Sequence, residues 1–326
     1  MTYLKDKLYL IYSDLYLGWQ LGLGDGSHPT NPVRAKLATE LLQERLGEAV
    51  VLVDPVDLTK ADSDEAALRA THAESYIDSV AAGRSNEWTG TKPELGVIAK
   101  AMFTGTIRAV EAILGGVKVA FNPQGAKHHA KYERSSGFCV FNDMAYAAVA
   151  FQEAGLKPLY LDWDIHAGDG VAEMLTGTGI PRISIHNGST FPGSYKFQTT
   201  FGPTHDEADH CYNFCVRHGD GDDVFMQFID QAREIIERYQ PDVILLAAGA
   251  DGHTGANNLG VDSNYTSVGY KYAAEMVADM ANKYSEGRVL IGGAGGYQPL
   301  KETPETWALV VETIFNKVRE GVLAND

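Results

Sequence analysis

Short apolar runs alternate with longer amphipathic stretches along most of the chain, and this alternation constrains the fold more than any other feature. Most short runs are continuously apolar, as is typical of parallel strands buried on both faces. We therefore predict an α/β fold of three layers (αβα), with helices on both sides of a mostly parallel central sheet and right-handed crossovers. The expected strands are Leu8–Tyr12, Val50–Val53, Val117–Phe121, Pro158–Trp163, Arg182–His186, Val243–Ala248 and Val289–Gly292. The expected helices are Pro32–Leu46, Gly96–Leu114, Asp143–Ala154, Asp223–Tyr239, Thr266–Tyr284 and Pro304–Val318.

The chain has 326 residues, 44% of them apolar, and no Pro/Gly/Ser-rich linker, charge block or repeat separates two halves. We therefore expect one domain over residues 1–326. No apolar run approaches the roughly 20 residues of a membrane helix, and the first twelve residues contain no cleavable apolar segment. We expect no membrane association and a cytoplasmic location.

The formal net charge of −16 argues against a sequence-independent nucleic-acid binder, which needs a basic surface. The same charge would steer a cationic substrate, but it also serves solubility alone, so it says little about the substrate. Three cysteines, Cys139, Cys211 and Cys215, form no disulfide framework. Cys211 and Cys215 have no second pair to complete a four-ligand metal site, and we interpret them as half-buried thiols of a strand.

The carboxyl ends of the strands are where ligands bind in open α/β sheets. Asp162, Asp164 and His166 follow the apolar run 158–161 and, at period two, point to one side. Two carboxylates and an imidazole there are costly without a cation, and this oxygen and nitrogen set suits zinc or another first-row ion. An acidic strand end with a capping aspartate is the weaker alternative, because three ligand-type residues alternate beside two glycines.

A second strand end repeats this pattern. The apolar run Val243–Ala248 leads into Gly249-Ala250-Asp251-Gly252. By itself such an aspartate is more often a helix cap or a turn former. Beside Asp164 and His166, however, Asp251 completes a three-ligand site with open positions, which is typical of a catalytic zinc.

Adjacent histidines follow a third strand. His128 and His129 lie in the loop after Val117–Phe121, where they could be polar loop residues, metal ligands, or a general base and acid. A carboxylate that accepts an imidazole N–H fixes the tautomer and raises the basicity of the ring. We therefore pair His128 with Asp162 and His129 with Asp169.

The last expected strand ends in the glycine-rich loop Gly292-Gly293-Ala294-Gly295-Gly296-Tyr297. It has no following Lys-Ser/Thr and no GxGxxG pattern, so a phosphate loop is not indicated. The loop can instead carry Tyr297 through a tight space, where its phenol would donate a hydrogen bond to a developing oxyanion. A packed aromatic side chain is the alternative for Tyr297.

These four segments, in this order, resemble the zinc-dependent histone deacetylase family, which includes bacterial acetoin-utilisation proteins and acetylpolyamine amidohydrolases. The resemblance extends over roughly Leu8 to Thr306 and implies an arginase/deacetylase-like fold. Other similar segments are His28-Pro29, Asn31-Pro32 and Arg34, a short helix at His72 to Tyr76, Ser136-Gly137-Phe138-Cys139 with Asn142-Asp143, and Ser184-Ile185-His186 followed by Phe191-Pro192-Gly193.

The resemblance also implies roles for these residues. Asp164, His166 and Asp251 would bind Zn²⁺, with Fe²⁺ as the other possible metal. The proton-transfer and carbonyl-polarising residues would be His128, His129, Asp162, Asp169 and Tyr297. Substrate would be bound by Gly137, Phe138 and Phe191, with the two phenylalanines as walls of an acyl-lysine tunnel. Asp162, Ser184 and the backbone carbonyls of Asp164 and His166 would hold a structural K⁺.

The expected reaction is removal of an acetyl or short acyl group from an acylated amine, with acetyl-lysine as the expected substrate. Alternatives are a small amide such as an acetylpolyamine, an arginase-like ureohydrolase, and a non-catalytic binder of acylated ligands. The chain departs from the family at Ala167, at Ala126-Lys127 and in the loop Gly255–Gly260. No clear equivalent of the family's rim aspartate is present; Glu87 and Glu94 are the candidates.

Overall fold

The computed structural model describes residues 4–22, 28–188, 202–256, 259 and 263–324. All the strands in these residues belong to one sheet. In this part of the chain nine strands lie in the order β2-β1-β3-β9-β8-β4-β5-β7-β6. Neighbouring strands are parallel except β6 and β7, which are antiparallel. The strands are β1 (Leu8–Ile11), β2 (Val50–Val53), β3 (Val119–Asn122), β4 (Pro158–Asp162), β5 (Arg182–Asn187), β6 (Gly202–Asp206), β7 (Cys211–Val216), β8 (Val243–Ala247) and β9 (Val289–Gly292).

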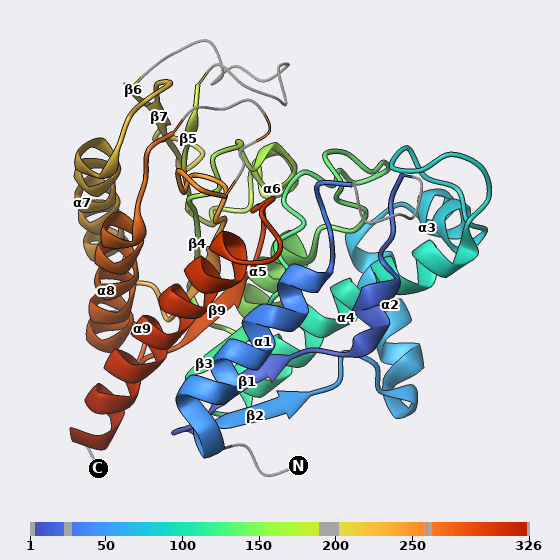
Figure 1. The fold of residues 1–326 in the computed structure, drawn as a ribbon, viewed down its shortest axis with the longest axis horizontal. Coiled ribbons are helices and arrows are strands. Elements are labelled where there is room, and N and C mark those ends of the chain that lie inside the picture. Colours follow the sequence, from blue (N-terminus) through green and yellow to red (C-terminus); the bar gives the residue numbers. More distant parts are fainter. Residues whose placement is uncertain (1–3, 23–27, 189–201, 257–258, 260–262, 325–326) are drawn as a thin grey trace.

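Helices cover both faces of this sheet (Figure 1), so the predicted three-layer α/β fold with a mostly parallel sheet is confirmed. The helices are α1 (Val33–Leu46), α2 (Ala61–Thr71), α3 (Glu74–Ala81), α4 (Pro93–Leu114), α5 (Asp143–Glu153), α6 (Asp169–Met174), α7 (Asp222–Tyr239), α8 (Ser267–Tyr284) and α9 (Glu302–Ala324). None of the helices in the described residues is long and apolar enough to cross a membrane.

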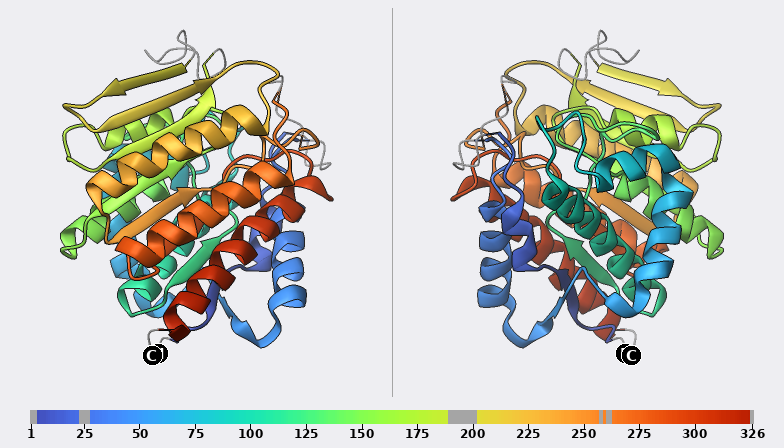
Figure 2. Two further views of the ribbon diagram at one scale, coloured as in Figure 1. Left: turned by 90° about the vertical axis from the view of Figure 1, so that its left-hand side faces the viewer. Right: turned by 90° about the vertical axis from the view of Figure 1, so that its right-hand side faces the viewer.

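The two views of Figure 2 separate the helical layers: α7, α8 and α9 lie in front of the sheet in one view, and α2 and α4 in the other. Successive side chains of a strand point to opposite faces of the sheet, so they pack into two hydrophobic cores, one on each face. Leu10 and Leu246 pack with α1, α7, α8 and α9, whereas Ile11 and Leu245 pack with α4 and α5. The central strands, such as β1 and β8, are therefore buried on both faces, which is why they are continuously apolar.

All seven predicted strands are present, and β6 and β7 extend the sheet beyond them. Cys211 and Cys215 lie on β7; both are buried rather than half-buried, and all three cysteines are free. β6 has the sequence Gly-Pro-Thr-His-Asp and, among the strands that the structure describes, pairs with β7 alone. An edge strand of this composition has no apolar alternation for a sequence pattern to detect.

Asn142 ties the start of α5 to the loop that carries the two histidines. Its side chain accepts a hydrogen bond from the backbone N–H of Ala145, as an N-cap does, and its Nδ2 donates to the carbonyl of Ala130 at 2.9 Å. The neighbouring carboxylate of Asp143 accepts the backbone N–H groups of Ala126 and Lys127. The first turn of α5 therefore fixes the backbone on both sides of the histidine pair.

Candidate metal and hydrolytic centre

The candidate residues come from four strands that are adjacent in the sheet, β3, β9, β8 and β4. His128 and His129 follow β3, Tyr297 follows β9, Asp251 follows β8, and the segment with Asp164 and His166 follows β4. Since neighbouring parallel strands end at the same edge, the fold brings these segments together from distant parts of the sequence. This is the location that the sequence pattern predicted.

Asp164, His166 and Asp251 are buried, and one ligand atom of each lies within 4.8 Å of the others. His166 Nδ1 is 2.8 Å from Asp251 Oδ2 and 3.2 Å from Asp164 Oδ1. Although burial opposes it, hydrogen bonding to the two carboxylates raises the pKa of His166 to about 10. No lysine or arginine of the described residues pairs with either carboxylate, so this donor set fits a divalent cation.

Gly295 explains why the loop after β9 is rich in glycine. Its N–H donates to Asp164 Oδ2 at 2.6 Å. A Cβ at this position would lie 2.3 Å from Asp251 Oδ2 and 2.5 Å from Asp164 Oδ2, closer than real Cβ contacts. The glycine therefore lets the backbone approach both carboxylates, and it leaves the phosphate-loop interpretation without support.

Both predicted histidine–carboxylate pairs are present. His128 Nδ1 lies 2.8 Å from Asp162 Oδ2, and His129 Nδ1 lies 2.8 Å from Asp169 Oδ1. Although burial opposes it, the charge of Asp162 raises the pKa of His128 to about 9. Burial, followed by the charge of His128, lowers the pKa of His129 to about 4. The two pKa values are thus shifted in opposite directions: Asp162 favours the charged form of His128, and burial favours the neutral form of His129.

Two further side chains hold these carboxylates, and the sequence analysis missed both. Lys131 Nζ lies 2.6 Å from Asp169 Oδ2 and 3.1 Å from a carboxylate oxygen of Glu173. The hydroxyl of Tyr160 donates to Asp162 Oδ2 at 2.6 Å. The available signal was spacing: Tyr160 precedes Asp162 by two residues on β4, so both side chains point to the same face.

The ring of Tyr297 lies next to the metal-ligand set, with its centroid 6.2 Å from that of the His166 ring. Burial, followed by the charges of Asp251 and Asp164, raises the pKa of Tyr297 well above its usual value. Its backbone N–H donates to the carbonyl of Ala256 at 2.8 Å, so the loop that departs from the family also positions this tyrosine. Its hydroxyl makes no hydrogen bond to a described residue.

Arg34 packs against Tyr297. In the sequence this arginine was recognised only as part of a segment similar to the family, and no role was predicted for it. Its guanidinium lies over the rings of Tyr297, at 5.8 Å, and Trp307, at 5.1 Å, and donates to the carbonyl of Gly296. Its Nε has no hydrogen-bond partner among the described residues. Arg34 therefore anchors the backbone that carries Tyr297.

A small cavity of about 20 Å³ is lined by Tyr297 and the two histidines and has room for one water molecule; the three candidate metal ligands are not among its lining residues. Gly137 and Phe138 line it, as expected for substrate-contacting residues, whereas Phe191 lies outside the described residues. The backbone N–H of Phe138 donates to Glu87 at 2.8 Å. Of the two candidate rim acids, Glu87 is thus the one beside the pocket, because Glu94 lies in the first turn of α4. The cavity is lined by Thr30, Arg34, Ala126, Lys127, His128, His129, Gly137, Phe138, Cys139, Ala294, Gly295 and Tyr297.

The structure shows the surroundings of two residues at which the chain departs from the family, Lys127 and Ala167. Lys127 is buried in the cavity wall, where its Nζ donates to Gln124 at 3.4 Å and burial lowers its pKa to about 8. Ala167, where the family commonly has a second histidine, is buried and packs with Ala172 and Cys211. Neither departure removes a group from the candidate centre.

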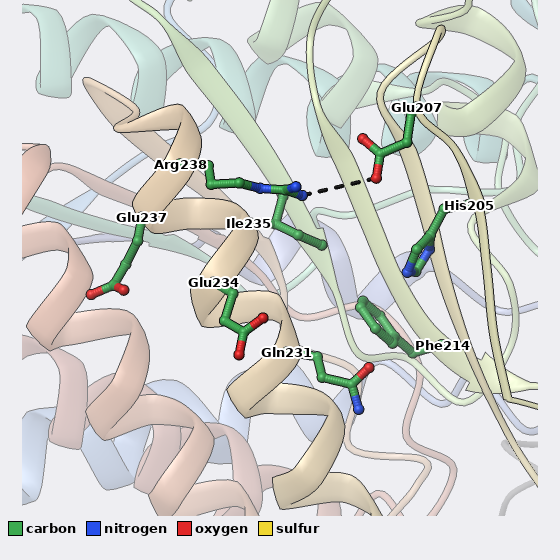
Figure 3. Close-up of a pocket in the computed structure, with 8 residues that line it drawn as sticks. All are labelled: His205, Glu207, Phe214, Gln231, Glu234, Ile235, Glu237 and Arg238. Carbon is green, nitrogen blue, oxygen red and sulfur yellow. Dashed lines mark ion pairs between the residues drawn. The ribbon is translucent and has the colours of Figure 1, made fainter.

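A larger cavity of about 530 Å³ lies elsewhere, between α7 and the β6–β7 pair (Figure 3). Glu234 and Ile235 reach it from the helix, and Phe214 from β7. Glu207 and Arg238 form an ion pair of 3.9 Å across it. None of the candidate residues lines this cavity, so its size gives no reason to place the chemistry there.

Comparison with known proteins agrees with this geometry. Residues 28–314 match the histone deacetylase domain. The chain is 27% identical to the acetoin utilization protein AcuC of Bacillus subtilis (strain 168), over 94% of this chain and 81% of that protein. It is 26% identical to AcuC of Staphylococcus aureus (strain MRSA252), over 98% and 84%. It is 28% identical to a probable deacetylase of Archaeoglobus fulgidus, over 85% and 79%. Most of the chain, including every candidate residue, lies within the matched region, and the protein belongs to the histone deacetylase domain family.

Proposed function

We propose that this protein is a zinc-dependent deacetylase that hydrolyses the amide bond of an acylated amine, with acetyl-lysine as its substrate. The products are the free amine and acetate, or another short carboxylate. One observation carries the proposal: metal-type ligands, two histidine–carboxylate pairs and Tyr297 converge at the ends of four adjacent strands. A non-catalytic binder would not need this complete set.

Asp164, His166 and Asp251 would hold the metal, for which Zn²⁺ is the first candidate and Fe²⁺ the second. When bound, such an ion supplies Lewis-acid activation of water and of the acyl carbonyl. The close approach of Gly295 to both carboxylates supports the assignment, because its N–H donates to Asp164 Oδ2 and helps to fix the orientation of that ligand. An arginase-like reaction would need additional aspartate ligands for a second ion, and the only group of ligand-type side chains found among the described residues is this one.

His129 is the proposed general base. Its Nδ1 is bonded to Asp169, which leaves Nε2 to accept a proton from the attacking water, and its lowered pKa keeps it neutral beforehand. The same atom then donates the proton to the leaving amine nitrogen. His128, held as a cation by Asp162, places positive charge beside the developing oxyanion. Tyr297 donates its phenolic O–H to that oxyanion.

Gly137, Phe138 and Phe191 are the proposed contacts of the acyl-lysine side chain. Asp162 and Ser184 stand opposite each other in the register of β4 and β5, which supports a K⁺ site there. We expect the single catalytic domain to occupy the whole chain and to act in the cytoplasm.

A small acylated amine such as an acetylpolyamine is the second candidate substrate. The carboxylate of Glu87, which accepts the backbone N–H of Phe138, favours a cationic ligand. The two candidates share one chemistry and differ in what carries the amide.

The proposed function is tested with purified enzyme whose metal content is measured. The metal is removed with a chelator and replaced with Zn²⁺ or Fe²⁺, and turnover of an acetyl-lysine peptide and of N-acetylputrescine is compared. Metal-dependent release of acetate supports a deacetylase, and the higher kcat/KM identifies the carrier. Turnover that persists without metal, or no turnover of any acylated amine by the metal-loaded protein, would contradict the proposal.

A further inference from the structure

A second polar cavity lies beside the candidate centre, between α3 and the segments 84–86 and 133–135. It has a volume of about 410 Å³ and is lined by two arginines, Arg84 and Arg134, and by hydroxyl groups that include those of Ser75 and Ser79. The only carboxylate among the lining residues is that of Glu133. Its lining is therefore rich in hydrogen-bond donors and carries a net positive charge.

The two arginines are unusual within this acidic protein. Both side chains are exposed, and neither forms an ion pair with a carboxylate of the described residues. Most other arginines in the described part do form such pairs, namely Arg45, Arg69, Arg108, Arg182, Arg233, Arg238 and Arg288. A guanidinium binds carboxylate or phosphate through a planar fork of N–H donors. Two guanidinium groups without a carboxylate partner among the described residues, in one cavity, are therefore suited to bind an anion.

Hydrogen bonds link the wall of this cavity to the wall of the substrate pocket. Ser85 Oγ bonds to Ser135 Oγ at 2.7 Å, and the backbone N–H of Asn86 donates to the same oxygen. The next residue, Glu87, accepts the backbone N–H of Phe138, which lines the small cavity of the centre. Ser135, which lines the arginine cavity, precedes Phe138 by three residues, so the backbones of these two residues are at most about 11 Å apart. A group near the acylated amine of a bound substrate can reach it.

We propose that this cavity binds an anionic group, a carboxylate or a phosphate, on the carrier of the acylated amine. The proposal rests on the proposed deacetylase function and sharpens its substrate class: acyl-lysine peptides with an acidic or phosphorylated neighbour. Two guanidinium groups at this place repel a cationic polyamine, against the direction of the overall net charge. The local charge decides between carriers, because the charges of distant surface groups are screened within about 10 Å at ordinary ionic strength.

The test uses four peptides that differ in one residue next to the acetyl-lysine: aspartate, phosphoserine, serine or lysine. The wild-type enzyme should show a kcat/KM about tenfold higher for the aspartate and phosphoserine peptides than for the serine peptide, mainly through KM, and lowest for the lysine peptide. The two acidic arms show whether carboxylate or phosphate is preferred. Added salt should reduce the differences.

The decisive variant is the double substitution Arg84→Gln with Arg134→Gln. It should remove the preference for both acidic peptides and leave kcat/KM for the serine peptide within about twofold. Arg238→Gln, an exposed arginine at the distant cavity of Figure 3, is the matched control and should keep the preference. Equal turnover of the four peptides by the wild type, or a preference that survives the double substitution, would overturn the anion site alone. Turnover of none of them would overturn the deacetylase function as well.

Discussion

Tyr297→Phe removes one hydroxyl from the centre and leaves the rest of the side chain in place. The ring keeps its contacts with Arg34, at 5.8 Å, and with His166, at 6.2 Å, and the backbone N–H keeps its bond to Ala256. The hydroxyl bonds to no described residue, so its loss leaves no protein group without its partner. We therefore expect the free energy of unfolding to change by less than about 0.5 kcal/mol.

The catalytic effect should be much larger. A donor aimed at an oxyanion is worth about 10²- to 10³-fold in kcat, or roughly 3–4 kcal/mol of transition-state stabilisation. The pKa of Tyr297 lies well above its usual value, so the wild-type phenol stays protonated and can donate a hydrogen bond throughout the neutral range. The assay is steady-state kinetics on the best acylated substrate, with metal content and urea unfolding measured on the same preparation. If the variant holds stoichiometric metal and keeps kcat within tenfold of the wild type, the oxyanion role of Tyr297 is wrong.

Three further predictions address other parts of the molecule. Asp251→Ala should lose the bound metal, measured by elemental analysis; stoichiometric zinc in a folded variant would refute the proposed ligand set. Lys131→Met leaves the buried Asp169 without its cation, so the free energy of unfolding should fall by about 3–5 kcal/mol in urea titrations, and Lys131→Arg should recover most of it. Burial lowers the pKa of His72 to about 4, below its unfolded value, so the unfolded chain takes up a proton that the folded protein excludes. Stability should be full above about pH 6.5 and fall by about 3 kcal/mol towards pH 4; an equal slope in His72→Gln would contradict this.

The predicted strands in the middle of the sheet share one physical property. β1 and β8 are buried on both faces, which forces a continuous apolar run that can be recognised without any tertiary information. The edge strand β2 is only partly buried and was recognised from its short apolar run. β7 is buried but was missed, because its sequence Cys-Tyr-Asn-Phe-Cys-Val interrupts the apolar run with a polar residue. β6 lies at the other edge and is held by backbone pairing with β7, so almost any sequence satisfies it. The helices α2 and α6 also escaped prediction. In α2 only Asp64 and Leu68 are buried, so the helix shows no apolar stripe, and α6 has only six residues.

Part of the candidate centre could likewise be predicted from local sequence patterns, and part of it could not. The alternation of Asp162, Asp164 and His166 is a local pattern, and so is the histidine pair. Their pairing with carboxylates could be inferred because a buried imidazole N–H needs an acceptor. The roles of Arg34 and Lys131 could not, because a long flexible cation has no local pattern that identifies its partner.

Local sequence patterns therefore encode the alternation that builds the sheet and the chemistry placed at the strand ends. The backbone and side-chain groups that surround this chemistry come instead from long-range tertiary contacts. The contact of Gly295 with Asp164 spans 131 residues, and that of Arg34 with Gly296 spans 262. The exposed cavity of Arg84 and Arg134 likewise depends on segments about 50 residues apart. Such contacts are fixed by how strands are ordered in the sheet, and strand order is set by the packing of all layers together rather than by any one segment.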